Sequence, residues 1–145
     1  MYSEKNLVYI FTILEVIEKI FEYTDKFKDY EEFYFANSQL NFNGTVNLLI
    51  AIGEDVKKID ENIKNDFLFE WKNIAKMRDK ISHNYRGIDP YMVWDIVQNH
   101  LVKVKIILIK VLQNTENFKS SLDDVLDSIY YQHLHYLKEY IKDVS

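Results

Sequence analysis

The sequence predicts an all-α protein, folded as a single-domain, up-and-down bundle of four to five helices over residues 1–145. The length of 145 residues fits one domain with a sizeable core. Apolar residues make up 48% of the chain, which favours folding over disorder. Only three glycines and one proline are available for tight turns, and this favours long helices over an all-β fold. Cysteine is absent, which excludes disulfides and thiolate metal sites.

The first predicted helix covers residues 4–28, with Ser3 as its N-cap. Apolar residues recur along it at helical spacing and form a wide stripe. A stripe of this width predicts contacts on two sides, either inside a bundle or with a second subunit. Residues 30–35 are mostly aromatic and either extend this helix or form a short connector.

The second predicted helix covers residues 42–59 and follows an Asn-rich loop over residues 37–44. A glycine inside a helix, such as Gly53, costs about 1 kcal/mol relative to alanine. Its presence therefore predicts that another helix approaches closely at this point. Residues 60–65 are polar and predict a connection between helices.

The third predicted helix covers residues 67–85. Its apolar residues follow one another at helical spacing and define a core-facing row: Phe67, Trp71, Ile74, Met77 and Ile81. Arg78 comes directly after Met77, so it lies about 100° from that row, toward the rim of a groove. Gly87 and Pro90 predict the end of this helix and a sharp turn.

The fourth predicted helix covers residues 90–113 and begins after Asp89, which is placed to cap it. A loop over residues 114–121 leads to a fifth, C-terminal helix over residues 122–141. His100, on the fourth helix, is interpreted as a surface or hydrogen-bonded histidine.

Two further histidines, His133 and His135, lie on the predicted C-terminal helix. They are two residues apart and so do not share a helix face, and no acidic partner completes a set of ligands. The sequence therefore predicts no metal site.

The third helix also carries the densest cluster of reactive side chains: Arg78, Asp79, His83 and Tyr85. Histidine titrates near neutrality and can take and return a proton, whereas the planar arginine fork binds phosphate oxygens. Together they suffice to cleave an RNA phosphodiester without a metal. On a regular helix Asp79 and His83 are neighbours, four residues apart.

Arg78 and His83 are five residues apart, so about 140° separates them on a regular helix. Either the long arginine side chain reaches round the helix, or the site is completed between two copies of the chain, which we favour. The alternative interpretation is structural, because histidine and arginine often occupy the exposed end of a helix, where they complement its dipole.

The net charge of −5 argues against a chain that binds nucleic acid over its whole surface. Between residues 72 and 86, however, five cations face one acid, Asp79: Lys72, Lys76, Arg78, Lys80 and Arg86. This basic stretch fits either a small phosphate-binding site or one solvated helix face. The N-terminal sequence predicts no signal peptide and the apolar runs are too short to span a bilayer, so we expect a cytoplasmic protein without membrane contact.

The spacing of Arg78, His83 and Tyr85 resembles the R-x4–6-H-x-Y signature of the HEPN superfamily. More narrowly, the chain resembles the HepT-like RNase toxins of the prokaryotic MntA–HepT (HEPN/MNT) toxin–antitoxin systems. Three flanking segments agree with that family: IAIGED at residues 50–55, WKNIAKMR at residues 71–78, and GID at residues 87–89 followed by VWDIV at residues 93–97. The resemblance covers residues 4–112.

The resemblance implies a helical bundle that forms a homodimer, with two Arg…His motifs facing one cleft. It implies a type VII-like toxin, a metal-independent endoribonuclease without cofactor, in which Arg78 and His83 are catalytic and Asp79 is auxiliary. It also implies that Tyr85 accepts AMP from a cognate MntA-like nucleotidyltransferase antitoxin, which neutralises the toxin.

The chain departs from the family pattern at Asn84, where many relatives carry an acid, and in the tail after residue 113. The tail leaves the geometry of the dimer open. Two other functions therefore stay in view: a non-catalytic HEPN adaptor that partners a nucleotidyltransferase, and a dimeric scaffold without ligand.

Overall fold

The computed structural model describes residues 1–83 and 87–141, except for the side chain of His83. These residues form helices and no strand, and the one β-type pairing among them is an isolated bridge between Tyr2 and Thr115. The all-α prediction is confirmed. No helix in the described part of the chain has the length and apolar character needed to cross a membrane.

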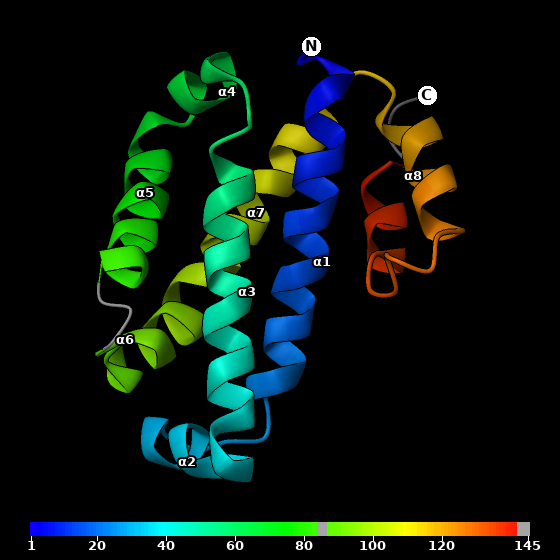
Figure 1. The fold of residues 1–145 in the computed structure, drawn as a ribbon. Coiled ribbons are helices and arrows are strands. Elements are labelled where there is room, and N and C mark those ends of the chain that lie inside the picture. The colour runs from blue at the N-terminus through cyan, green and yellow to red at the C-terminus, as the bar shows by residue number, and fades with distance from the viewer. Residues whose placement is uncertain (84–86, 142–145) are drawn as a thin grey trace.

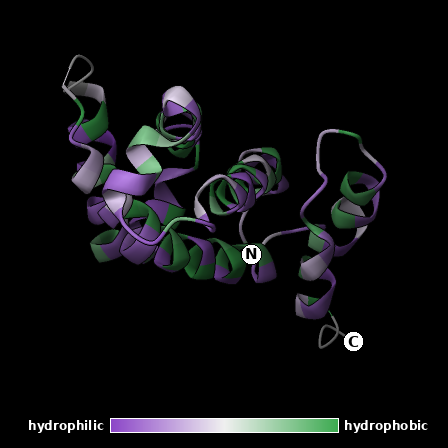
Figure 2. Ribbon diagram, turned by 90° about the horizontal axis from the view of Figure 1, so that it is seen from below, coloured by the Kyte–Doolittle hydropathy of each residue, from purple (hydrophilic) through white to green (hydrophobic). Residues whose placement is uncertain are grey.

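Two long helices, α1 (Leu7–Thr24) and α3 (Leu40–Val56), lie side by side at the centre of the molecule (Figure 1). The Ser3 side chain accepts a hydrogen bond from the Lys5 N–H at the turn Glu4–Asn6 before α1, as predicted for the N-cap. The apolar stripe of α1 is buried on two sides, because α3 packs on one side and the C-terminal part of the chain packs on the other. Seen from below, hydrophobic and hydrophilic residues alternate along the helices (Figure 2), as expected for helices that bury one face.

A short helix, α2 (Tyr30–Phe35), connects α1 with α3, and the Asp29 carboxylate caps it by accepting from the Glu32 N–H. The next turn reverses the chain through three residues in the left-handed region, at Asn37, Ser38 and Gln39. The predicted loop over residues 37–44 is too long, since α3 already begins at Leu40. The three left-handed residues reverse the chain direction within a few positions, so the longer loop is not needed.

Residues 60–65 are not the polar connection that we predicted, because they contain the helix α4 (Glu61–Asp66). Ile63 is fully buried and anchors this helix in the core. Asn6 fixes its beginning, since its side chain donates to the Asp60 carboxylate and accepts from the Asp60 N–H. The hydrogen bond that the Asn6 amide donates to the Asp60 carboxylate, followed by that from Lys5, lowers the pKa of Asp60.

The motif helix α5 (Leu68–His83) agrees with the predicted helix over residues 67–85 as far as the structure describes it. The predicted core-facing row is confirmed for Trp71, Ile74, Met77 and Ile81, each of which is buried. Phe67 is only partly buried and lies just before the helix begins.

The predicted fourth helix is divided into α6 (Pro90–Asp95), a π-helical turn (Ile96–His100) and α7 (Leu101–Gln113). Asp89 caps α6 by accepting from the Tyr91 N–H, as predicted. The apolar residues at helical spacing in this segment are buried: Val93, Ile96, Val97, Leu101, Val104, Ile107, Leu108 and Val111.

The predicted C-terminal helix over residues 122–141 is wrong. The helix α8 (Phe118–Leu126) begins earlier and ends at Leu126, and a 3-10 helix (His135–Tyr140) follows after a turn. At that turn the Ser128 hydroxyl accepts from the Tyr130 N–H, a local hydrogen bond that competes with the helical pattern. The chain folds back beside α1 instead of extending away from it (Figure 1).

His133 holds this C-terminal segment on α1. Its Nδ1 lies 2.5 Å from Glu15 Oε2 and its Nε2 lies 2.7 Å from Glu22 Oε1, while its backbone N–H donates to Glu15 Oε1. Partial burial alone would lower the pKa of His133, but the hydrogen bonds to Glu15 and Glu22 outweigh it and the pKa is raised. The imidazolium therefore bridges two carboxylates of α1.

We expect His133→Gln to lower the melting temperature at pH 6 and to matter less at pH 9. A raised folded-state pKa stabilises the protein below the unfolded pKa of about 6.5, and this contribution is lost as the pH rises through the folded-state value. A hydrogen bond to a charged group contributes about 1.5–3 kcal/mol, so the loss at pH 6 corresponds to about 4 °C or more.

Thermal unfolding followed by circular dichroism at both pH values measures this difference. The control is His135→Gln, at an exposed histidine of the same segment. An equal deficit at pH 6 and pH 9 would show that the charge of His133 contributes nothing.

Candidate active site

Arg78 lies against the α3 backbone at Gly53. A Cβ atom added to Gly53 would come within 2.6 Å of Arg78 Cγ and 3.2 Å of its Cδ, closer than real side chains approach. Glycine is thus the residue that lets the stem of Arg78 cross α3 at this depth. The predicted close approach at Gly53 is confirmed, and the group that approaches is the motif arginine itself.

The guanidinium of Arg78 is held at its outer end by the neighbouring residue. Arg78 Nη2 donates to Asp79 Oδ1 over 3.3 Å, with 26% of the Arg78 side chain and 55% of the Asp79 side chain exposed. Exposure of this size screens the ion pair and makes it weak. The pair therefore orients the guanidinium and leaves it open to an anion from solvent.

Two of the four predicted site residues are thus brought together by the structure. The side chain of His83 lies outside the described residues, and so does Tyr85. The predicted contact between Asp79 and His83 therefore stays a prediction, whereas the contact that Asp79 makes is with Arg78.

The helix itself extends without a break from Arg78 to His83. The 140° separation of these two positions on a regular helix therefore applies. Arg78 turns toward α3, whereas the exposed Lys76 lies on the outer face of α5. Lys72, one further turn away, extends this basic face.

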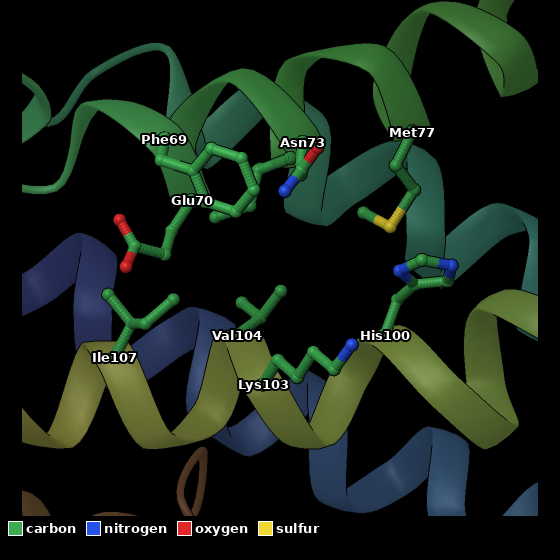
Figure 3. Close-up of a pocket in the computed structure, with 9 residues that line it drawn as sticks. Phe69, Glu70, Asn73, Met77, His100, Lys103, Val104 and Ile107 are labelled. Carbon is green, nitrogen blue, oxygen red and sulfur yellow. The ribbon is translucent and has the colours of Figure 1, made fainter.

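On another side of α5, a cavity of about 230 Å³ separates this helix from α7 (Figure 3). Apolar side chains from both helices face each other across it, among them Phe69 and Ile107, while Glu70 lies toward one end and His100 and Lys103 toward the other. His100, interpreted as a surface or hydrogen-bonded histidine, is about half exposed and pairs with Asp95 at 3.4 Å.

The sequence did not reveal this cavity, because its walls come from two helices about 30 residues apart. The sequence carries no signal for it: Leu68, Phe69, Val102 and Ile106 are apolar residues of these two helices, and only the structure shows that they are exposed. No cluster of three or more potential metal ligands occurs in residues 1–83 and 87–141. The acidic partners of His133 were also missed, because they lie on α1, more than 100 residues away.

Comparison with known proteins gives a consistent result. Residues 13–111 match the family model of the HepT-like ribonucleases. A relative from Methanocaldococcus jannaschii, whose name proposes an RNase, is 33% identical over 109 residues, covering 74% of this chain and 88% of its own. A second relative from the same organism, with the same kind of name, is 32% identical over 109 residues, covering 74% of this chain and 91% of its own.

A relative from Thermococcus cleftensis, whose name proposes a ribonuclease HepT, is 33% identical over 104 residues, covering 67% of this chain and 86% of its own. No solved structure matches the chain significantly. The family match ends at residue 111, so α8 and the segment that carries His133 lie beyond it.

The contact between Gly53 and Arg78 can be tested by a double-mutant cycle. In the native protein we expect Gly53→Ala to lower the free energy of unfolding by about 1–3 kcal/mol, because the new methyl group collides with the Arg78 side chain. With Arg78→Ala the collision is removed, and the same substitution should stabilise by about 0.5–1 kcal/mol through helix propensity.

Urea unfolding of the four proteins gives the coupling energy. Gly44→Ala, on the same helix and against Tyr23, provides a control that should show no coupling to Arg78→Ala. Additive effects of Gly53→Ala and Arg78→Ala would contradict the contact.

Proposed function

Because the chain belongs to the HepT-like ribonuclease family, we propose that it is a metal-independent endoribonuclease whose catalytic residues are Arg78 and His83. The observation that carries this proposal is the setting of Arg78: its guanidinium is oriented and partly exposed, on the helix whose described part extends to His83. The basic outer face of that helix supplies further positive charge for an RNA backbone.

In the proposed reaction the imidazole of His83 takes the proton of a 2′-hydroxyl, and the 2′-oxygen attacks the adjacent phosphorus. The bond to the 5′-oxygen breaks, and the imidazolium of His83 gives its proton to this leaving oxygen, so that the products are a 2′,3′-cyclic phosphate and a 5′-hydroxyl. Arg78 stabilises the charge that grows on the phosphate oxygens. Asp79, as the auxiliary residue, keeps the guanidinium oriented before RNA binds.

We further propose that the site is completed in a homodimer. Arg78 turns toward α3, and position 83 comes five residues later on the same helix, about 140° round its axis on a regular helix, which favours a site shared between two copies.

The face around the cavity between α5 and α7 suits such a pairing. Its exposed Phe69 and Ile106 offer apolar area, and the cavity carries Glu70 toward one end and Lys103 toward the other. About a two-fold axis, the acidic end of one copy would meet the basic end of its partner.

The same proposal extends to regulation. We propose that the protein is the toxin of a type VII-like toxin–antitoxin pair in a prokaryotic cytoplasm, and that a MntA-like nucleotidyltransferase neutralises it by transferring AMP to Tyr85. A bulky, negatively charged nucleotide two residues after His83 would block the cleft and offset its positive charge. This step rests on the sequence motif.

The second candidate function is a non-catalytic HEPN adaptor of a nucleotidyltransferase. The pairing of Arg78 with Asp79 favours it to some degree, because an acid beside the cation weakens the attraction for phosphate. RNA cleavage separates the two functions.

We expect Arg78→Ala to reduce the rate of RNA cleavage by about 10²–10³-fold and His83→Ala by about 10²–10⁴-fold. Gel analysis of labelled RNA incubated with purified protein in EDTA measures both effects. Lys119→Ala and His135→Ala, at exposed positions of the C-terminal part, are controls that should cleave normally. Equal cleavage by all five proteins, or none by the native protein, would overturn the enzyme proposal.

A shared site makes a second prediction. When Arg78→Ala and His83→Ala chains are unfolded together and refolded, mixed dimers carry one intact arginine and one intact histidine in the same cleft. We expect about a quarter of native activity to return, because half the dimers are mixed and one of their two sites is complete. If each site lies within one chain, the mixture will be as inactive as its components.

A further inference from the structure

A groove of about 490 Å³ runs along α3 on the side of the motif. One wall carries three amide side chains, Gln39, Asn43 and Asn47, and the other includes Gly87 and Ile88, which follow the motif helix closely. The remaining lining residues are aromatic or apolar: Tyr34, Phe42, Val46 and Ile50. The volume falls in the range of small-ligand sites.

The amides form a row that leads to the candidate active site. Asn43 and Asn47 lie four residues apart on α3, about 6 Å along its axis, and Gln39 lies in the left-handed turn just before the helix. Ile50 and Gly53 continue the same face, and Gly53 is the residue on which Arg78 lies. The groove and the guanidinium therefore share one side of α3.

The chemistry of the groove differs from that of the motif helix. No charged side chain lines it in the part of the chain that the structure describes. The side-chain amides of Asn43 and Asn47 are exposed and make no hydrogen bond to the described residues. Each amide offers two donors and one acceptor, and the ring of Tyr34 offers an aromatic surface.

We propose that this groove binds a base of single-stranded RNA adjacent to the phosphate that Arg78 contacts, an inference that rests on the proposed function. Unpaired RNA bases are recognised by stacking on aromatic rings and by hydrogen bonds to their edges, which Tyr34 and the two asparagines can provide. The neutral groove takes the base while the neighbouring cation takes the phosphate. Residues of α3 would then determine which base is preferred at the cleavage site, and residues of α5 would carry out the cleavage.

The test is direct binding of four tetranucleotides (A, C, G or U) with 2′-O-methyl groups, which block attack by the 2′-oxygen. We expect the NMR side-chain amide signals of Asn43 and Asn47 to shift with at least one of them. The signal of Asn65, an exposed asparagine on α4, should stay in place.

The variant Asn43→Ala/Asn47→Ala should weaken binding by about tenfold, which equals about 1.4 kcal/mol. Tyr34→Leu should weaken it as well, whereas Tyr34→Phe, which keeps the ring, should not. Asn65→Ala is the matched control, and circular dichroism verifies that each variant is folded.

The outcomes separate this inference from the proposed function. Binding that is equal in the double variant and in Asn65→Ala, or no binding by the native protein at millimolar oligonucleotide, overturns the groove even if RNA is cleaved. If binding depends on Asn43 and Asn47 but the protein cleaves no RNA, the base-binding groove is supported and the proposed ribonuclease activity is overturned.

Discussion

The crossing of α3 and α5 at Gly53 is the constraint on which the candidate site depends. A side chain at this position would occupy the space that Arg78 Cγ fills, so the arginine reaches its place only over a bare stretch of backbone. The buried row of Trp71, Ile74 and Met77 fixes the rotation of α5 about its axis. Given that rotation, the residue after Met77 must point along the edge of the core, beside α3. The same packing thus determines both the stability of the helix pair and the direction of the guanidinium.

Much of this arrangement could be predicted from the sequence because it depends on helical periodicity. The row from Trp71 to Ile81 and the cap at Asp89 follow from local spacing and local hydrogen bonds. Gly53 could be recognised as a point of close approach, since a helix tolerates glycine poorly without a reason in packing. That the partner would be Arg78 could not be predicted, because the contact joins residues 25 positions apart on different helices.

The prediction of a C-terminal helix over residues 122–141 failed for a physical reason. The segment over residues 122–141 has helical periodicity, but hydrogen bonds at Ser128 and contacts of His133 with Glu15 and Glu22 draw the chain back onto α1. Glu15 lies almost fully buried on α1, where a carboxylate needs a partner. Its partner comes from more than 100 residues away, a distance over which periodicity carries no information. A local hydrogen bond at Ser128 and tertiary hydrogen bonds of His133 together outweighed the helical preference of this segment.

The division of charge explains how an acidic chain can act on RNA. A net charge of −5 would repel nucleic acid over most of the surface, so in the proposed function RNA would approach through the basic outer face of α5. Arg78 is set back from that face, against α3 and beside Asp79, where long-range attraction counts for less than local geometry. The exposed Lys72 and Lys76 would therefore attract the RNA backbone, and Arg78 would bind the phosphate that reacts. On this view, an arginine on the outer face of α5 would strengthen the initial binding of RNA but would lie away from the phosphate on which charge develops. The close fit of Arg78 against Gly53 would therefore matter more for catalysis than its charge alone.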